Sequence, residues 1–453
     1  MLRLALVLLL VSAAWADTYT STLHKEYNND QKILDANGNY IDNPNFGEDG
    51  KHLHDVHNEQ DLIYYGDVYF WKETSDEPER LQVIMDTGSS WLWAPSSICR
   101  GCPSDDSLDH SYLVNRGEGV KSIQYGSGGI SGDIVRGMVS LSPKKEESIT
   151  DYKMLEVTQA SLPGLEGSNW DGILGLLPTS ISGSDLFVTE LYKAGLIKRD
   201  AFGVHYTDTA SGSEITFGGF DTSIVEEEDD FTFVDLHDGM HWSGDLKRIK
   251  YGAFGELPDK AKVAILDSGT SLILVPQEIF DGFTALVSDG RKCGQLGVYY
   301  GCYCDSKYDF DPLYFWFGNY EYKASPEHYI VETWTNRQRF CYFLIQGSSI
   351  KKNSIILGDA FLRNYYVYHD VENERMGLYG DYMLYYRPEI FTTYFWIVAG
   401  LALFCALLLV CCLYYCCVCK SSKPEDEERL VGRDHKPSEL GAQPSGKLLN
   451  VYS

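Results

Sequence analysis

The stretches Asp86-Thr-Gly-Ser-Ser90 and Asp267-Ser-Gly-Thr-Ser271 decide how this chain is interpreted. Each follows a short apolar run, 81–85 and 263–266, of the kind that forms a buried strand. Glycine permits a tight turn, and small hydroxyl side chains can bond the backbone and an adjacent carboxylate. One such stretch alone is typical of an ordinary turn that is capped by aspartate. Two of them, each after an apolar strand, predict two similar lobes that each supply one aspartate to a shared interface.

Four further segments keep a fixed order around these two stretches. They are Trp91-Leu-Trp93-Ala-Pro-Ser-Ser97, Ser122-Ile-Gln-Tyr125-Gly-Ser-Gly128, Trp170-Asp-Gly-Ile-Leu-Gly-Leu176 and Ile355-Ile-Leu-Gly-Asp-Ala-Phe-Leu-Arg-Asn-Tyr365. Together the segments resemble the pepsin family of aspartic proteases over most of residues 60 to 385. The resemblance implies a mainly β, bilobal pepsin-like fold. The sequence agrees, because strand-forming runs such as 214–219 alternate with Gly-rich turns.

The resemblance also implies roles for individual residues. Asp86 and Asp267 would be the catalytic pair, supported by hydrogen bonds to their carboxylates. The supporting residues would be Gly88, Ser89, Gly269 and Thr270. The segment 122–128 would form a flap over the substrate cleft, with Tyr125 and Gly126 at its tip and Trp93 bonding the Tyr125 hydroxyl. The alternatives are an ordinary hairpin tyrosine at Tyr125 and core packing at Trp93.

Two facing carboxyl groups could hydrolyse an amide without another nucleophile. Like charges about 3 Å apart cannot both ionise, so one proton would be shared between them. The ionised member would take a proton from water while the protonated member polarises the scissile carbonyl. We therefore expect an aspartic-type endopeptidase that acts on peptides or proteins at acidic pH, with no cofactor and no metal. The alternatives are a catalytically silent peptide-binding receptor of the same fold and an adhesion protein.

Charge excludes one class of partner. The 453 residues carry a formal net charge of −27, whereas nucleic-acid binding needs basic patches. The acidity suits either solubility or an acidic compartment, and composition does not choose between them. A strongly acidic run at 226–230 is expected to be a solvated loop. We expect the protein to be a monomer.

Composition changes along the chain predict its organisation. The predicted segments are a signal peptide at 1–16, a propeptide or N-terminal extension at 17–58, lobes at 59–220 and 221–386, a transmembrane segment at 391–419 and a cytoplasmic tail at 420–453. This order predicts a zymogen and a type I single-pass membrane protein of the secretory or endolysosomal pathway or the cell surface. Histidines in the segment 17–58 could form a pH-sensitive latch, or the segment could be a plain extension.

The cysteines divide in the same way. Six precede the apolar segment, and an even number in an oxidising compartment predicts three disulfides. Spacing leaves the connectivity open, and a redox role for Cys99 and Cys102 is the alternative. The family resemblance implies the pairs Cys99–Cys102, Cys304–Cys341 and Cys293–Cys302. Six more lie in or beside the apolar segment, where they would serve as palmitoylation sites or as small packing residues.

Overall fold

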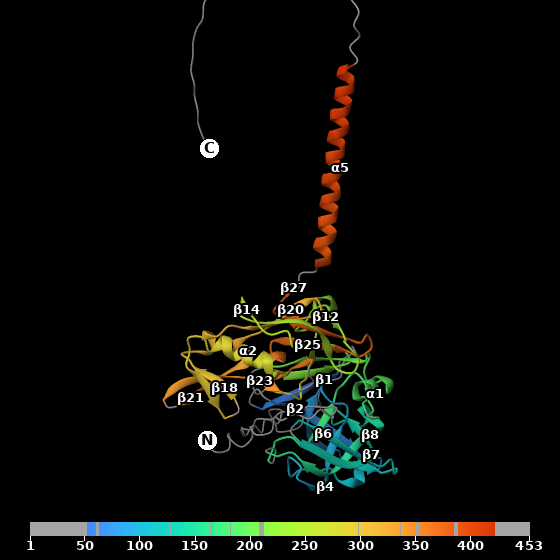
Figure 1. The fold of residues 1–453 in the computed structure, drawn as a ribbon. Coiled ribbons are helices and arrows are strands. Elements are labelled where there is room, and N and C mark those ends of the chain that lie inside the picture. Colours follow the sequence, from blue (N-terminus) through green and yellow to red (C-terminus); the bar gives the residue numbers. More distant parts are fainter. Residues whose placement is uncertain are drawn as a thin grey trace, which may run out of the picture. The chain divides into compact units, whose positions relative to one another are not determined.

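The computed structural model describes residues 52–59 and 63–421, apart from 127, 164, 166, 182, 208–212, 298, 336, 349–352 and 385–387. The predicted signal peptide, most of the segment 17–58 and nearly all of the cytoplasmic tail lie outside the described residues. The chain divides into two compact units, with the division between Tyr386 and Arg387. Figure 1 shows that strands dominate the first unit, as the sequence predicts.

The largest sheet has fourteen strands and draws on both halves of the first unit. In spatial order it contains β12 (Thr232–Asp235), β26 (Arg375–Gly380), β25 (Tyr365–Asp370), β10 (Ala201–His205), β11 (Ser213–Phe217), β1 (His52–Glu59), β2 (Ile63–Trp71), β3 (Glu79–Asp86), β9 (Gly172–Gly175), β4 (Trp93–Arg100), β8 (Ile149–Ser161), β7 (Gly128–Ser140) and β5 (Leu113–Val114), and β6 (Val120–Tyr125) pairs with β7. Strand β10 of the first half pairs with β25 of the second half, although more than 150 residues separate them in sequence, and β25 pairs in turn with β26. The sheet therefore joins the two halves into one body.

Two smaller sheets complete the strands of the second half. The nine-stranded sheet contains β23 (Ile345–Ser348), β16 (Ile273–Pro276), β24 (Ser354–Leu357), β15 (Val263–Leu266), β13 (Ser243–Tyr251), β19 (Leu313–Phe317), β20 (Tyr320–Ala324) and β27 (Tyr382–Leu384), and β14 (Gly255–Glu256) pairs with β13. The four-stranded sheet contains β17 (Cys293–Leu296), β18 (Tyr299–Tyr303), β22 (Gln338–Phe343) and β21 (Ile330–Thr335). The helices are α1 (Phe187–Lys193), α2 (Gln277–Val287), α3 (Pro326–Tyr329), α4 (Asp359–Leu362) and α5 (Pro388–Ser421), with short 3₁₀ turns at His110–Tyr112, Lys145–Glu147, Glu228–Asp230 and Lys307–Asp309.

Burial patterns explain why these segments form strands. Strand β2 alternates between buried and half-buried positions, which is the period of a strand with one covered face. Strands β9, β15 and β24 are buried along their whole length, as expected for apolar runs with parallel neighbours. One hydrophobic cluster extends from Tyr64 of the first half to Leu378 of the second. The two halves therefore share a core, which includes Met85 and Leu266, the residues directly before the two aspartates.

Strand β1 changes the expectation for the N-terminal segment. It pairs with β11 and β2, and the predicted boundary at 58/59 falls inside it. Residues 52–58 are therefore part of the largest sheet. Whether the segment 17–58 is removed from the protein stays a prediction.

Helix α5 is the candidate for membrane insertion. Its window Trp396–Tyr414 has 19 residues with a mean hydropathy of 2.8. A span of about 20 apolar residues is long enough to cross a bilayer. The helix encloses the predicted segment 391–419, and by length and composition it could span a membrane.

Three disulfide bonds cross-link the described part of the first unit. They join Cys99 to Cys102, Cys293 to Cys302 and Cys304 to Cys341, which are the pairs that the resemblance implied. The last two lie in the four-stranded sheet, where Cys302 and Cys341 occupy paired positions of β18 and β22.

The acidic run at 226–230 is only partly the solvated loop that we expected. Glu228 accepts hydrogen bonds from Arg199 at 2.7 Å and from Arg375 at 2.6 Å. Arg375 also donates at 2.8 Å to Asp370, whose side chain is fully buried. The expectation fails at Glu228, because the two arginines come from segments distant in sequence. The other four residues of the run are exposed, as expected.

Candidate active site

The two Asp-containing stretches are folded in the same way. Asp86 ends β3 opposite Gly175 of the parallel strand β9, and Leu266 ends β15 opposite Leu357 of the parallel strand β24. Gly175 donates its amide to Trp91 O, and Gly358 donates its amide to Leu272 O, both at 3.1 Å. Trp91 and Leu272 stand at the same offset from their aspartates. The structure therefore contains the repeated unit that the sequence predicted.

Glycine is required where the neighbouring strand meets each turn. A Cβ atom at Gly175 would lie 2.6 Å from Ser89 O, and one at Gly358 would lie 1.9 Å from Thr270 O. Both contacts are with backbone, which cannot easily move away. The two glycines therefore allow each turn to press against the strand beside it.

Four hydrogen bonds join the two turns to each other. The Thr87 amide donates to Ser268 Oγ at 2.9 Å, and the Ser268 amide donates to Thr87 Oγ1 at 2.9 Å. The same hydroxyls donate to the main chain across the interface, Thr87 to Leu266 O at 3.3 Å and Ser268 to Met85 O at 2.6 Å. Because every bond connects one half to the other, this network fixes the two aspartates relative to each other.

Both carboxyl groups are buried at this junction. Asp86 is 0% exposed and Asp267 is 2% exposed. A Cβ atom at Gly88 would lie 2.4 Å from Asp267 Oδ1, so the first turn lies directly against the second carboxyl group. The Gly88 amide donates to Asp86 Oδ1 at 2.8 Å, and the Gly269 amide donates to Asp267 Oδ1 at 2.9 Å. The predicted glycines therefore stand where they can hold the carboxyl groups.

The two hydroxyl supports are not equivalent. Thr270 Oγ1 donates to Asp267 Oδ2 at 2.9 Å. Asp86 Oδ2 and Ser89 Oγ are buried, and neither has a hydrogen-bond partner among the described residues. The expected bond from Ser89 is therefore absent in this structure.

Burial raises the pKa of both carboxyl groups. It raises the pKa of Asp86 to about 6, while the nearby Ser89 hydroxyl and the Gly88 amide oppose the rise. Burial, and then the negative charge of Asp86, raise the pKa of Asp267 well above its ordinary value. These values belong to the pair, because each group responds to the charge of the other. The pair therefore keeps a proton in mildly acidic solution.

The segment 122–128 forms the hairpin that we predicted. Strands β6 and β7 pair from Val120 to Tyr125, and Tyr125 lies opposite Gly128. A Cβ atom at Gly128 would lie 1.9 Å from Ser161 O, and its φ of +147° also favours glycine. The close turn between Tyr125 and Gly128 contains Gly126.

The tyrosine of this hairpin lies near the first aspartate. Tyr125 is 1% exposed, and burial raises its pKa well above the ordinary value, with a further contribution from the charge of Asp86. The Trp93 indole is close enough to oppose that rise. However, the Tyr125 hydroxyl and Trp93 Nε1 have no hydrogen-bond partner among the described residues. Trp93 instead packs edge to face on Trp170 at 6.4 Å, so its core-packing role is the one that this structure shows.

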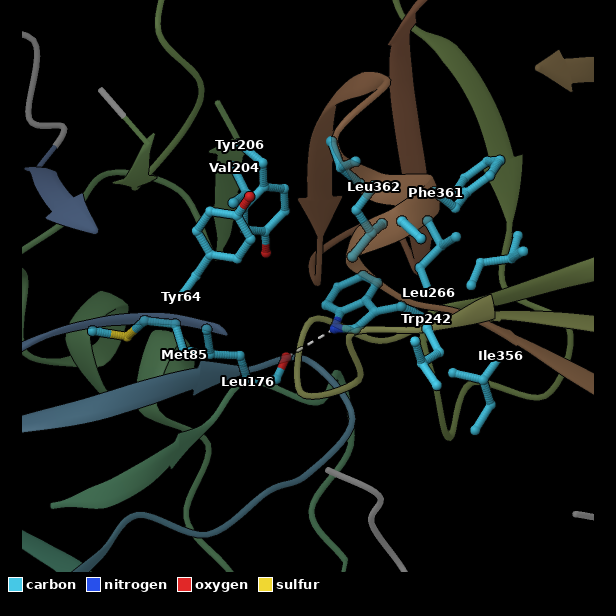
Figure 2. Packing of buried hydrophobic residues seen from close by; sticks show 14 of the residues in the cluster. Tyr64, Met85, Leu176, Val204, Tyr206, Trp242, Leu266, Ile356, Phe361 and Leu362 are labelled. Carbon is cyan, nitrogen blue, oxygen red and sulfur yellow. Dashed lines mark hydrogen bonds between the residues drawn. The ribbon is translucent and has the colours of Figure 1, made fainter. Parts of the chain in front are cut away.

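Sequence patterns did not indicate three buried aromatic residues that pack near the two aspartate turns. Figure 2 shows Tyr64 and Tyr206 close together, and their ring centres are 4.4 Å apart. Burial, and then the charge of Asp359, raise the pKa of Tyr206 well above its ordinary value, while the Ser268 hydroxyl opposes the rise. Figure 2 also shows Trp242, whose Nε1 donates to Leu176 O at 2.8 Å. These residues lie far from both motifs in sequence, and only the high aromatic content hinted at them.

Comparisons with known proteins agree with this geometry. A family model described as "Eukaryotic aspartyl protease" matches residues 64–379. Vacuolar protease A of Neurospora crassa is 28% identical over 343 residues, which cover 73% of this chain and 81% of that protein. Plasmepsin IV of Plasmodium falciparum is 33% identical over 342 residues, covering 73% of this chain and 71% of that protein. Gastricsin of Mus musculus is 26% identical over 339 residues, covering 70% and 81%.

Proposed function

Because this chain belongs to the eukaryotic aspartyl protease family and is an aspartic-type endopeptidase, we propose that Asp86 and Asp267 are its catalytic pair. The observation that carries the proposal is the burial of both carboxyl groups at one junction, with four hydrogen bonds between their turns. Two carboxyl groups held at such a junction can share one proton, which is the state that this hydrolysis needs.

In the proposed reaction the ionised carboxylate takes a proton from a water molecule, and the water oxygen bonds to the scissile carbonyl carbon. The protonated carboxyl group gives its proton to the carbonyl oxygen, which forms a neutral tetrahedral diol. The carboxyl group that took the water proton then gives a proton to the amide nitrogen, while the ionised carboxylate takes one from a diol hydroxyl, so that the C–N bond breaks and an acid and an amine are released. The pair ends with one proton, as it began. Because burial raises the pKa of Asp86 to about 6, we propose an optimum on the mildly acidic side of neutrality.

The substrate would be an extended peptide, held by strand-like hydrogen bonds beside the hairpin β6–β7. Tyr125 would exclude water from the reacting groups when the hairpin closes over the peptide. We expect the protease to act as a monomer, which light scattering of the purified chain would measure.

The direct test is hydrolysis of a mixed peptide library by the full chain in detergent from pH 3 to 7.5. We expect Asp86→Asn and Asp267→Asn each to lower kcat/KM by at least about 100-fold, because each removes a proton-transfer group. Asp105→Asn, at an exposed surface aspartate, is the matched control and should be unchanged. A statine-type inhibitor should block the wild type. Retained activity in either buried variant would overturn the assignment, and peptide binding without cleavage by the wild type would favour the receptor alternative.

We also propose that α5 anchors the protease in a membrane, with the catalytic body on the luminal or outer side. The support is the apolar window of 19 residues, followed by Lys420 and Lys423 in the sequence. The full chain should resist alkaline carbonate extraction, and a variant that ends at Tyr386 should be released. N-terminal sequencing of the mature protein would test cleavage after Ala16 and the removal of the segment 17–58.

A further inference from the structure

A histidine that the proposed reaction does not use is buried in the core of the largest sheet. His369 lies on β25 and is 2% exposed. Its ring stacks on Phe202 of β10 with centres 4.3 Å apart and planes 5° apart. Its ring also contacts the Trp242 ring in an edge-to-face arrangement, with centres 4.8 Å apart. The Nδ1 atom has no hydrogen-bond partner among the described residues.

No charged side chain of the described residues compensates this imidazole. On β25 and β26 the charged neighbours are Asp370 and Arg375, which bond each other at 2.8 Å. Side chains alternate along a strand, so Asp370 lies on the opposite face of the sheet from His369. On β10, His205 stacks on Tyr366, which is also on that opposite face. The titratable residues that flank these elements are Asp200 before β10 and His241 beside Trp242, and neither is among the groups that act on His369.

Trp242 connects this histidine to both catalytic turns. Its Nε1 donates to Leu176 O at 2.8 Å (Figure 2), and the Leu176 amide donates to Asp86 O at 2.8 Å. The Trp242 carbonyl accepts a hydrogen bond from the Leu266 amide at 2.8 Å, directly before Asp267. Trp242 therefore forms hydrogen bonds with Leu176, which contacts Asp86, and with Leu266, which precedes Asp267.

We propose that His369 is a positioning residue that must stay neutral. Its protonation would displace Trp242 and break the hydrogen bonds by which Trp242 holds the main chain next to Asp86 and Asp267. The inference rests on the proposed function in one respect only, because it takes Asp86 and Asp267 as the reacting groups. An imidazolium between Phe202 and Trp242 would have no counter-ion among the described residues, so the ring would have to leave this buried site to become solvated. Acid would then inactivate the protease by protonating a histidine of its core.

The direction of the titration agrees with this geometry. Burial lowers the pKa of His369 to about 3, against the opposing effect of main-chain groups of Phe202 and Val367. The unfolded chain takes up a proton on this histidine near its ordinary pKa of 6.5, which the folded chain does not. The stability that a neutral His369 provides is therefore complete above pH 6.5 and is lost as the pH falls toward 3. Over that window the unfolded chain carries one more proton than the folded chain, so the unfolding constant rises about tenfold for each unit by which the pH falls.

The test compares the wild-type full chain in detergent with His369→Phe, which keeps a flat ring against Phe202. Urea unfolding at pH 3 to 7 gives the unfolding constant of each protein at each pH. We expect the constant of the wild type, divided by that of His369→Phe, to rise about tenfold for each unit by which the pH falls below about 6. We expect the variant to keep its activity after incubation at pH 2.5, below the pKa of His369, where the wild type loses most of its activity. His237→Phe, at an exposed histidine, is the matched control and should follow the wild type.

A pH-independent ratio of unfolding constants would overturn the proposal. A changed ratio with unchanged acid inactivation would overturn the coupling through Trp242. His369→Met removes the same titration and replaces the first variant if that one does not fold. The unfolding measurement needs no catalysis, so a protein without proteolytic activity would refute the proposed function while leaving the histidine result readable.

Discussion

Replacing Asp86 by asparagine should stabilise the fold near neutral pH while lowering catalysis at least about 100-fold. Burial raises the pKa of Asp86 from 3.8 to about 6, so the folded protein holds this proton more tightly than the unfolded chain does. The resulting stability is complete below pH 3.8 and is lost as the pH rises through about 6. A shift of about two pH units corresponds to about 3 kcal/mol. Asparagine does not titrate and therefore avoids that loss.

The assay is urea unfolding of the full chain in detergent, followed by tryptophan fluorescence from pH 4 to 7.5. The free energy of unfolding of Asp86→Asn, minus that of the wild type, should increase with pH by about 2–3 kcal/mol. His369 is present in both proteins, so its titration cancels in the difference. Asp105→Asn, at an exposed site, should show no pH-dependent difference. A difference that is constant with pH, or that decreases as pH rises, would refute the argument that burial controls the pKa of the pair.

Three further predictions concern the supports of the site and the fold. Gly88→Ala places a Cβ atom 2.4 Å from Asp267 Oδ1, so we expect kcat to fall about 100-fold with an unchanged circular dichroism spectrum. Arg375→Met leaves the buried carboxylate of Asp370 with only the more distant Arg199 as a charged partner. It should lower the free energy of unfolding by about 3 kcal/mol in urea titrations. Replacing Cys304 and Cys341 by serine opens a link across 37 residues and should cost about 2–4 kcal/mol in the same assay.

Each of these predictions has a result that would contradict it. Wild-type kcat in the glycine variant would mean that the Asp267 carboxyl group moves aside without consequence. An unchanged unfolding curve for Arg375→Met would mean that Arg199, which lies 3.7 Å from Asp370, compensates fully. Equal stability of the double serine variant and the wild type would mean that packing alone holds β18 against β22.

Much of the fold could be predicted because its signals are local. A strand, a tight turn and a pair of small hydroxyl residues are recognisable from neighbours along the chain, and they occur twice. The hairpin at 122–128 and the apolar helix are local patterns of the same kind. The supporting bonds were harder to predict. Thr270 bonds its aspartate whereas Ser89 does not, although both stand at the same offset, because a hydrogen bond depends on distances that spacing does not contain.

The sequence by itself determined which residues were candidates for each role: two aspartates on equivalent turns, a hairpin tyrosine, six cysteines before the apolar segment and one apolar helix. The tertiary structure alone decided their environment. It placed Thr87 against Leu266 across 179 residues, buried both carboxyl groups, and enclosed His369 between Phe202 and Trp242. Side-chain identity is written in the chain, but burial and contact arise between segments that meet only on folding. Because those two quantities set the pKa of each buried group, the pH behaviour of this protease could be inferred only from its three-dimensional structure.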